Sequence, residues 1–102
     1  MTESEITQAL NKLWEAAPSV MESFGDEFTY RQFLRRVMEC SKHAYIDLLQ
    51  ANYHRDDPFD AAQQQIGKRL KKMAEAAGFQ RYEKGMDQSI FDRETLKITY
   101  RR

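Results

Sequence analysis

The sequence is poor in the residues that make cross-links, tight turns and membrane spans. Its 102 residues include one cysteine, two prolines and four glycines. A single cysteine excludes an internal disulfide and is typical of a protein from the reducing cytosol. No apolar run approaches the ~18–20 residues of a membrane span, and the opening MTESEITQAL lacks the basic-then-apolar pattern of a signal peptide. We therefore expect a cytoplasmic protein that does not associate with membranes.

The motifs of common enzymes and metal sites are also missing. The sequence has no phosphate-binding loop, no Gly-x-Gly-x-x-Gly and no His-Glu-x-x-His. Cys40 and His43 lie three residues apart, but His54 is the only other histidine, and structural zinc normally needs four such ligands. We expect no cofactor, no metal and no catalysis, and we predict that Cys40 is buried on an apolar helix stripe.

The chain does have enough apolar material for one core. It is 41% hydrophobic and 31% charged, with six Phe, five Tyr and one Trp. This is the composition of an ordinary globular protein, and the length fits a single domain over residues 1–102.

Local patterns predict two helices in the first quarter of the chain. Thr2 and Glu5 have the spacing of a capping box, which opens the first helix. Pro18 is expected to end that helix or to begin a second, short one. Gly25 and Asp26 indicate a turn after it.

The segment FTYRQF carries the clearest local signal in the chain. Thr29 and Gln32 have the spacing of a capping box, and Phe28 and Phe33 occupy the two positions of a hydrophobic staple. The helix that begins here is expected to run to about Asn52 as one long, central helix. Its apolar stripe is predicted to be Phe33, Val37, Cys40, Ala44 and Leu48.

A basic helix is predicted next, with a cap formed by Asp57-Pro58 or by Asp60. Gly78 suits the position just past its C-terminal end. Its buried stripe is predicted to be Ile66, Leu70, Met73 and Ala77. The opposite side then carries Gln64, Lys68, Lys71 and Glu75, with Arg69 and Lys72 beside them.

After the basic helix, the periodicity changes to that of strands. FQRYEK and LKITYRR are predicted to pair as an antiparallel hairpin with a long tip from Gly85 to about Glu94. Ile90 and Phe91 are candidates for a third short strand within the tip. The chain is therefore expected to be an α+β fold, mostly helical, with three to four helices followed by a C-terminal antiparallel β-hairpin.

Charge is divided unevenly between the two parts of the chain. Residues 1–62 hold six basic and eleven acidic side chains, a net charge of −5, whereas residues 63–102 hold ten basic and five acidic ones, a net charge of +5. Such segregation indicates a binding end. Chance, or pairing of two oppositely charged faces in a homo-oligomer, remains the alternative.

The basic helix and the hairpin together point towards nucleic acid. Lys and Arg neutralise phosphates, and Gln can hydrogen-bond base edges. The hairpin adds Arg81, Lys84, Arg93, Lys97, Arg101 and Arg102. A solvated face that only keeps the protein soluble is the alternative. Phe79 and Tyr82 are expected in the core of the sheet, with stacking on single-stranded nucleic acid as the other interpretation.

The run IGKRLKKMAEAAGFQRYEKG, followed by LKITYRR, resembles the C-terminal part of winged helix-turn-helix domains. Those domains carry a pattern of the form Ile-Gly-Arg-x-Leu-x-x-x-Gly-Phe-x-x-x-Arg before a hairpin that ends in an aromatic residue. The residues that match in type and order are Ile66, Gly67, Leu70, Gly78, Phe79 and Tyr100. The resemblance implies a winged-helix-like fold, in which the helix before the wing enters the major groove and the wing contacts the DNA backbone or the minor groove.

Carried over to this chain, the resemblance implies a non-enzymatic protein that binds duplex DNA. A regulator from a phage or mobile element is one version of this hypothesis, and a homodimer on two half-sites is compatible with it. On the helix, the DNA-contacting residues would be Gln64, Lys68, Lys71 and Lys72. On the wing they would be Arg81, Lys84 and Arg93.

A protein-interaction module is the alternative function. An accessory factor, or a phage-encoded inhibitor whose acidic face imitates nucleic acid, would bind a basic partner through the acidic N-terminal half. The region around Trp14 and Phe24 is a second candidate surface for such a partner.

Overall fold

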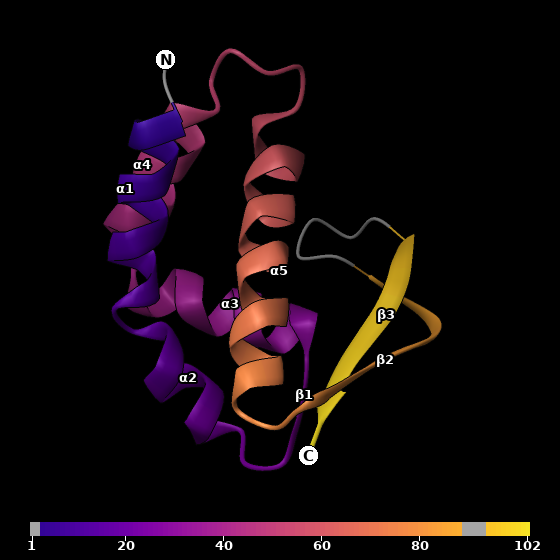
Figure 1. The fold of residues 1–102 in the computed structure, drawn as a ribbon. Helices are drawn as coiled ribbons and strands as arrows, with labels where there is room; N and C mark the ends of the chain where they lie inside the picture. Colours follow the sequence, from indigo (N-terminus) through magenta and orange to yellow (C-terminus); the bar gives the residue numbers. More distant parts are fainter. Residues whose placement is uncertain (1–2, 89–93) are drawn as a thin grey trace.

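The computed structural model describes residues 3–88 and 94–102, without the side chains of residues 3, 4, 84, 86–88 and 94–96. The described elements are α1 (Glu3–Trp14), α2 (Ala17–Ser23), β1 (Glu27–Thr29), α3 (Tyr30–Cys40), α4 (Lys42–Ala51), α5 (Pro58–Ala76), β2 (Gln80–Gln88) and β3 (Glu94–Arg101). Helix α5 stands between the α1/α4 pair and the sheet (Figure 1). The predicted α+β fold with a C-terminal antiparallel hairpin is confirmed.

The capping box at the start of α3 is formed as predicted. The Gln32 backbone N–H donates to the Thr29 hydroxyl at 3.2 Å, and the Thr29 N–H donates to the Gln32 side-chain oxygen at 2.9 Å. The Phe28 and Phe33 rings lie 6.0 Å apart between centroids, as expected of a hydrophobic staple. The other predicted capping box, at Thr2, lies outside the described residues.

The ends of α5 follow local sequence signals. Asp57 is the N-cap, and its carboxylate accepts the Asp60 N–H at 3.1 Å, so of the two predicted caps the Asp57-Pro58 one is used. Gly78 has φ +91°, a left-handed conformation that favours glycine. The Gly78 N–H donates to the Glu75 carbonyl at 3.1 Å, which closes the helix as predicted.

The prediction of one long helix from FTYRQF to Asn52 is wrong. The chain leaves helical geometry at Ser41, with φ −133° and ψ +53°, and continues as a separate helix, α4. The bend lets α4 pack along α1 while α3 crosses behind α5 in the view of Figure 1. Cys40, at the end of α3, is exposed rather than buried on the stripe. Tertiary packing here overrides a continuous helical period.

The buried stripe of α5 also differs from the prediction at its C-terminal end. Ile66 and Leu70 are buried as expected, but Ala77 is exposed and Met73 is only partly buried. The buried residues of α5 are Ala62, Ile66, Leu70 and Ala74. These four residues recur every four positions and therefore lie along one side of the helix.

The sheet contains one strand that the sequence patterns did not indicate. Strand β1 pairs antiparallel with β3, in the order β1-β3-β2, and Phe28 lies opposite Tyr100. This third strand precedes α3, whereas the predicted one, at Ile90 and Phe91, lies outside the described residues. The short β1 has no alternating pattern of its own because it is only three residues long.

The hairpin tip is shorter than predicted. Strand β2 continues past Gly85 to Gln88, which lies opposite Glu94 in β3. Gly85 has φ +77° and falls in the register shift between Glu83 and Met86. It therefore belongs to a bulge within the strand rather than to the turn.

A pair of side-chain amides, of which Asn52 is buried and Gln65 partly buried, fixes the connection between α4 and α5. Asn52 is fully buried, and its Nδ2 donates to the Leu48 carbonyl and to Gln65 Oε1, both at 2.9 Å. Gln65 Nε2 donates back to Asn52 Oδ1 at 2.9 Å. Because α5 carries the basic residues, this pair helps to set the direction in which they are presented.

We predict that Asn52→Ala lowers the free energy of unfolding by about 1–3 kcal/mol, because the Gln65 amide is left without its partner. Urea unfolding followed by circular dichroism measures the change. Gln50→Ala is the matched control, because Gln50 is exposed in the last turn of α4, two residues before Asn52. Equal unfolding midpoints for the two variants would contradict a structural role for the amide pair.

Candidate functional site

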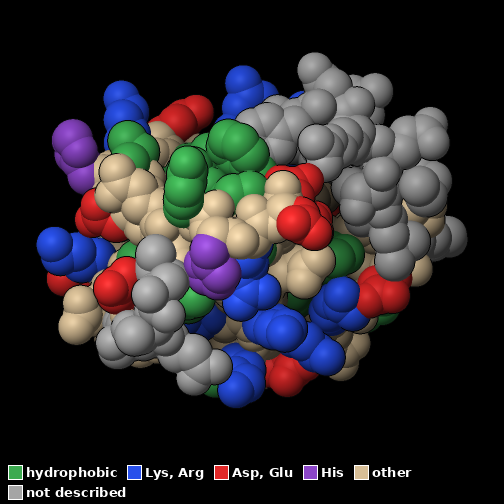
Figure 2. Space-filling view, turned by 90° about the horizontal axis from the view of Figure 1, so that it is seen from above, with side chains coloured by type: hydrophobic (Ala, Val, Ile, Leu, Met, Phe, Trp, Pro, Cys, Tyr) green, Lys and Arg blue, Asp and Glu red, His purple; other side chains and the backbone are tan. Residues whose placement is uncertain are grey.

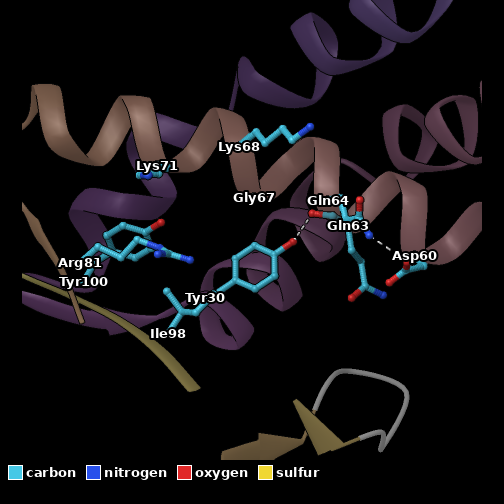
Figure 3. Close-up of a pocket in the computed structure, with 10 residues that line it drawn as sticks. All are labelled: Tyr30, Asp60, Gln63, Gln64, Gly67, Lys68, Lys71, Arg81, Ile98 and Tyr100. Carbon is cyan, nitrogen blue, oxygen red and sulfur yellow. Dashed lines mark hydrogen bonds between the residues drawn. The ribbon is translucent and has the colours of Figure 1, made fainter. Parts of the chain in front are cut away.

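A groove lies between α5 and the helix-facing side of the sheet (Figure 3). Its volume is about 340 Å³. It is lined by Tyr30, Asp60, Gln63, Gln64, Gly67, Lys68, Lys71, Arg81, Ile98 and Tyr100. Residues from α3, α5, β2 and β3 therefore meet at one surface feature, although they are distant in the sequence.

Four of the predicted DNA-contacting residues line this groove. Gln64, Lys68 and Lys71 come from α5, and Arg81 comes from β2. The two lysines are exposed and have no ion-pair partner among the described residues. The helix and the hairpin thus present cations to the same space.

The remaining predicted residues lie elsewhere or outside what is described. Lys72 is exposed on α5 but does not line the groove. The backbone of Lys84 belongs to β2, and its side chain is not described. Arg93 lies outside the described residues.

Two of the four predicted DNA-contacting residues in the groove, Gln64 and Arg81, already have partners within the protein. Arg81 forms an ion pair with Glu83, two residues further along β2. The Gln64 Nε2 donates to Asp60 Oδ2 at 2.9 Å, one helical turn away. Both partners are exposed, so a ligand can compete for these side chains.

The floor of the groove consists of residues that the sequence did not indicate as functional. The Tyr30 hydroxyl donates to the Gln63 carbonyl of α5 at 2.5 Å, so its ring lies against the helix. Ile98 and Tyr100 add apolar surface from β3. Of the groove residues that are not predicted DNA contacts, Gly67 and Tyr100 belong to the winged-helix-like pattern in the sequence, whereas Tyr30 and Ile98 were not indicated. The distance of Tyr30 from α5 in the sequence explains why it was missed.

Burial controls the protonation of the tyrosines around the groove. Burial raises the pKa of Tyr30 strongly, and the neighbouring Tyr45, Tyr100 and Asp60 add to the effect. Burial also raises the pKa of Tyr100, and the adjacent Arg81 guanidinium opposes that rise. The hydroxyls of Tyr30 and Tyr100 therefore keep their protons to a more alkaline pH than an exposed tyrosine does.

The two C-terminal arginines, expected to add to a basic hairpin, are paired with acidic residues of the N-terminal half. Arg101 forms an ion pair with Glu27 at 2.5 Å. Arg102 contacts Asp26 at 3.3 Å and Glu22 at 3.4 Å. Some basic residues of the C-terminal part therefore pair with acidic residues of the N-terminal part within the same chain.

The two aromatic residues at the start of β2 have different environments. Phe79 is buried in the core as expected, and the Arg102 guanidinium lies 4.6 Å from its ring centroid. Tyr82 was also expected in the core, but its side chain is 43% exposed. Residues in a strand alternate between faces, and Tyr82 points to the side of the sheet away from α5, with Arg101 5.5 Å from its ring centroid.

Basic side chains on the surface are partly gathered and partly dispersed. Seen from above, several Lys and Arg side chains lie side by side in one area, while others are spread around the rim (Figure 2). On α5 the exposed cations are Lys68, Lys71 and Lys72. Arg69, on the same helix, is only partly exposed, because its guanidinium lies 5.5 Å from the Trp14 ring centroid and donates to Asn11. It belongs to the packing of α5 on α1.

The described part of the chain holds neither a cluster of metal ligands nor a membrane-spanning helix. No group of three His, Cys, Asp or Glu side chains there is arranged to hold a metal ion. Both Cys40 and His43 are exposed. None of the described helices combines the length and the apolar character needed to cross a bilayer.

We predict that alkaline pH destabilises the protein, and that Tyr30→Phe reduces this effect. Because the pKa of Tyr30 is raised in the folded state, the unfolded chain loses its tyrosine proton first as the pH rises above about 10. The contribution of protonated Tyr30 to the free energy of unfolding is complete below that pH and is lost as the pH rises above it. Melting temperatures between neutral pH and pH about 11 test this. Tyr53→Phe, at an exposed tyrosine, is the control and should leave the profile unchanged.

The groove, its apolar floor and its cations describe a site that fits an anionic ligand. Comparison of the chain with protein-family models, curated proteins and solved structures yields no match. The function of the site is therefore inferred from its own geometry and charge.

Proposed function

We propose that the chain is a non-enzymatic DNA-binding protein of winged-helix type, with α5 as the helix that enters the major groove. The observation that carries this proposal is the set of exposed cations on α5. These are Lys68, Lys71 and Lys72. None of the three has an ion-pair partner among the described residues, so their charge is available to a ligand.

The physical basis of the interaction is neutralisation of phosphates. Each lysine that approaches a DNA phosphate releases condensed counterions, which supplies a large part of the binding free energy at low salt. Gln64, which is exposed on the same helix, has an amide that can contact base edges once it leaves Asp60. Arg81, from the first hairpin strand, adds a cation on the other side of the groove.

The position of the hairpin supports the same proposal. Strand β2 begins four residues after α5 ends, and the two elements face each other across the groove. A helix inserted into the major groove would bring the hairpin close to the adjacent backbone. This is the relation between helix and wing that the sequence resemblance implies.

A protein-interaction module is the second candidate, and exposed hydrophobic side chains favour it. Tyr53 is 81% exposed, and Ile46 and Phe59 are each about half exposed. Hydrophobic side chains gather on part of the face seen in Figure 2. Binding of a basic partner to the acidic N-terminal half is less well supported, because Glu22 and Glu27 pair with the C-terminal arginines. Trp14 and Phe24, the other predicted surface, pack against the core.

We predict that the double variant Lys68→Glu/Lys71→Glu abolishes binding to mixed-sequence duplex DNA, because two attractive charges become repulsive. Fluorescence anisotropy with a labelled duplex at low salt measures this. Lys42→Glu is the matched control, since Lys42 is an exposed lysine on α4 that does not line the groove. Circular dichroism verifies that all variants are folded. Binding that survives the double reversal, or an unchanged protein that binds no duplex, refutes the proposal.

The salt dependence of binding gives a further prediction. The logarithm of the association constant should fall linearly with the logarithm of the salt concentration, with a slope of about −0.9 for each neutralised phosphate. Lys68→Gln and Lys71→Gln should each make the slope shallower by about 0.9. A titration series in sodium chloride measures it. Equal slopes for the unchanged protein and both variants would show that Lys68 and Lys71 do not neutralise DNA phosphates.

A further inference from the structure

The floor of the groove has a property that duplex binding leaves unexplained. Tyr30 and Ile98 occupy the middle of the groove, between its charged and polar ends (Figure 3). In a duplex the faces of the bases are stacked on each other and are not accessible to protein side chains. An unpaired nucleotide, in contrast, offers a base face that can pack on an aromatic or aliphatic surface. The apolar floor is therefore better suited to an unpaired base.

Gly67 lies beside the Tyr30 ring on the α5 side of this floor. A Cβ atom added at Gly67 would lie 3.7 Å from the ring carbons and hydroxyl oxygen of Tyr30, which is an ordinary contact distance. Gly67 is not among the glycines with positive φ, so its backbone conformation does not require glycine. A glycine inside a helix destabilises it relative to alanine. The residue thus weakens α5 and places no side chain beside the Tyr30 ring.

The two ends of the groove differ in chemistry. Lys71 and Arg81 lie at one end, and Asp60 and Gln64 lie at the other (Figure 3). A nucleotide has the same polarity, with an anionic phosphate at one end and a hydrogen-bonding base edge at the other. The volume of about 340 Å³ is at the lower end of the range for small-ligand sites, which suits one nucleotide rather than a longer segment.

We propose that the groove between α5 and the sheet binds one unpaired nucleotide of a DNA strand. Its phosphate lies between Lys71 and Arg81, its base covers Tyr30 and Ile98, and the base edge faces Asp60 and Gln64. This inference rests on the proposed DNA binding and specifies it further. The preferred ligand is then a duplex with a single-stranded extension rather than a blunt duplex.

The first test uses the unchanged protein and three labelled DNAs in fluorescence anisotropy. One is a blunt duplex, one carries a short single-stranded extension, and one carries an extension of the same length made of abasic sites. The abasic extension has the same phosphates but no bases. We expect the normal extension to raise the affinity about tenfold over the blunt duplex, the size expected for stacking of one base. The abasic extension should give little of this gain.

A second test changes the groove and keeps the lysines. Gly67→Leu fills the space beside Tyr30 and should lower the affinity for the extended duplex more than the affinity for the blunt duplex, so that the gain from the extension is lost. Gly67→Ala is the matched control, because it removes the glycine without adding a long side chain. It should raise the melting temperature by a few degrees and retain most of the gain. If Gly67→Leu fails to fold, the comparison of normal and abasic extensions on the unchanged protein still tests whether the groove binds an unpaired base.

The outcomes separate this inference from the proposed function. Equal affinities for blunt and extended duplexes, or an abasic extension as effective as the normal one, overturn the nucleotide site and leave duplex binding intact. Absence of binding to all three DNAs overturns the proposed function itself. A tenfold preference that needs the bases, and that is lost in Gly67→Leu, supports the nucleotide site.

Discussion

The packing of aromatic rings around Phe28 is the interaction on which the rest of the structure depends. The Phe28 ring lies 5.2–6.0 Å from the rings of Phe24, Phe33, Phe79 and Tyr100, measured between centroids. These residues come from the chain after α2, from α3, from the segment between α5 and β2, and from β3. Aromatic pairs at such distances contribute about 0.5–1.5 kcal/mol beyond the burial of their area. The cluster holds the sheet against the helices, and the groove exists only because the sheet is held there.

Charge is used in two different ways on the two sides of this cluster. At the C-terminal end, Arg101 and Arg102 pair with acidic residues near β1 and fix the edge of the sheet. On α5, Lys68 and Lys71 have no ion-pair partner in the described part of the chain. Net charge near zero therefore conceals a division between cations that hold the fold together and cations that are available to a ligand.

The candidate site could be predicted only in part. Helical periodicity was sufficient to place Gln64, Lys68 and Lys71 on the exposed side of α5, because neighbours on a helix face are fixed by local geometry. It could not show that Tyr30 and Ile98 form a floor beside them, because those residues reach α5 only through the packing of α3 and β3. The same limit applied to Arg101 and Arg102, whose acidic partners are more than seventy residues away.

By itself the sequence determined the features that are stabilised within a few residues. The Thr29 capping box, the Asp57 N-cap and the Gly78 helix end each depend on hydrogen bonds to the nearest turn, so their patterns could be recognised directly. Tertiary structure alone decided the bend at Ser41, the pairing of β1 with β3 and the exposure of Tyr82. Each of these depends on which surface is covered by a distant segment. Burial of apolar area against that segment outweighs the small local preferences that a sequence pattern records.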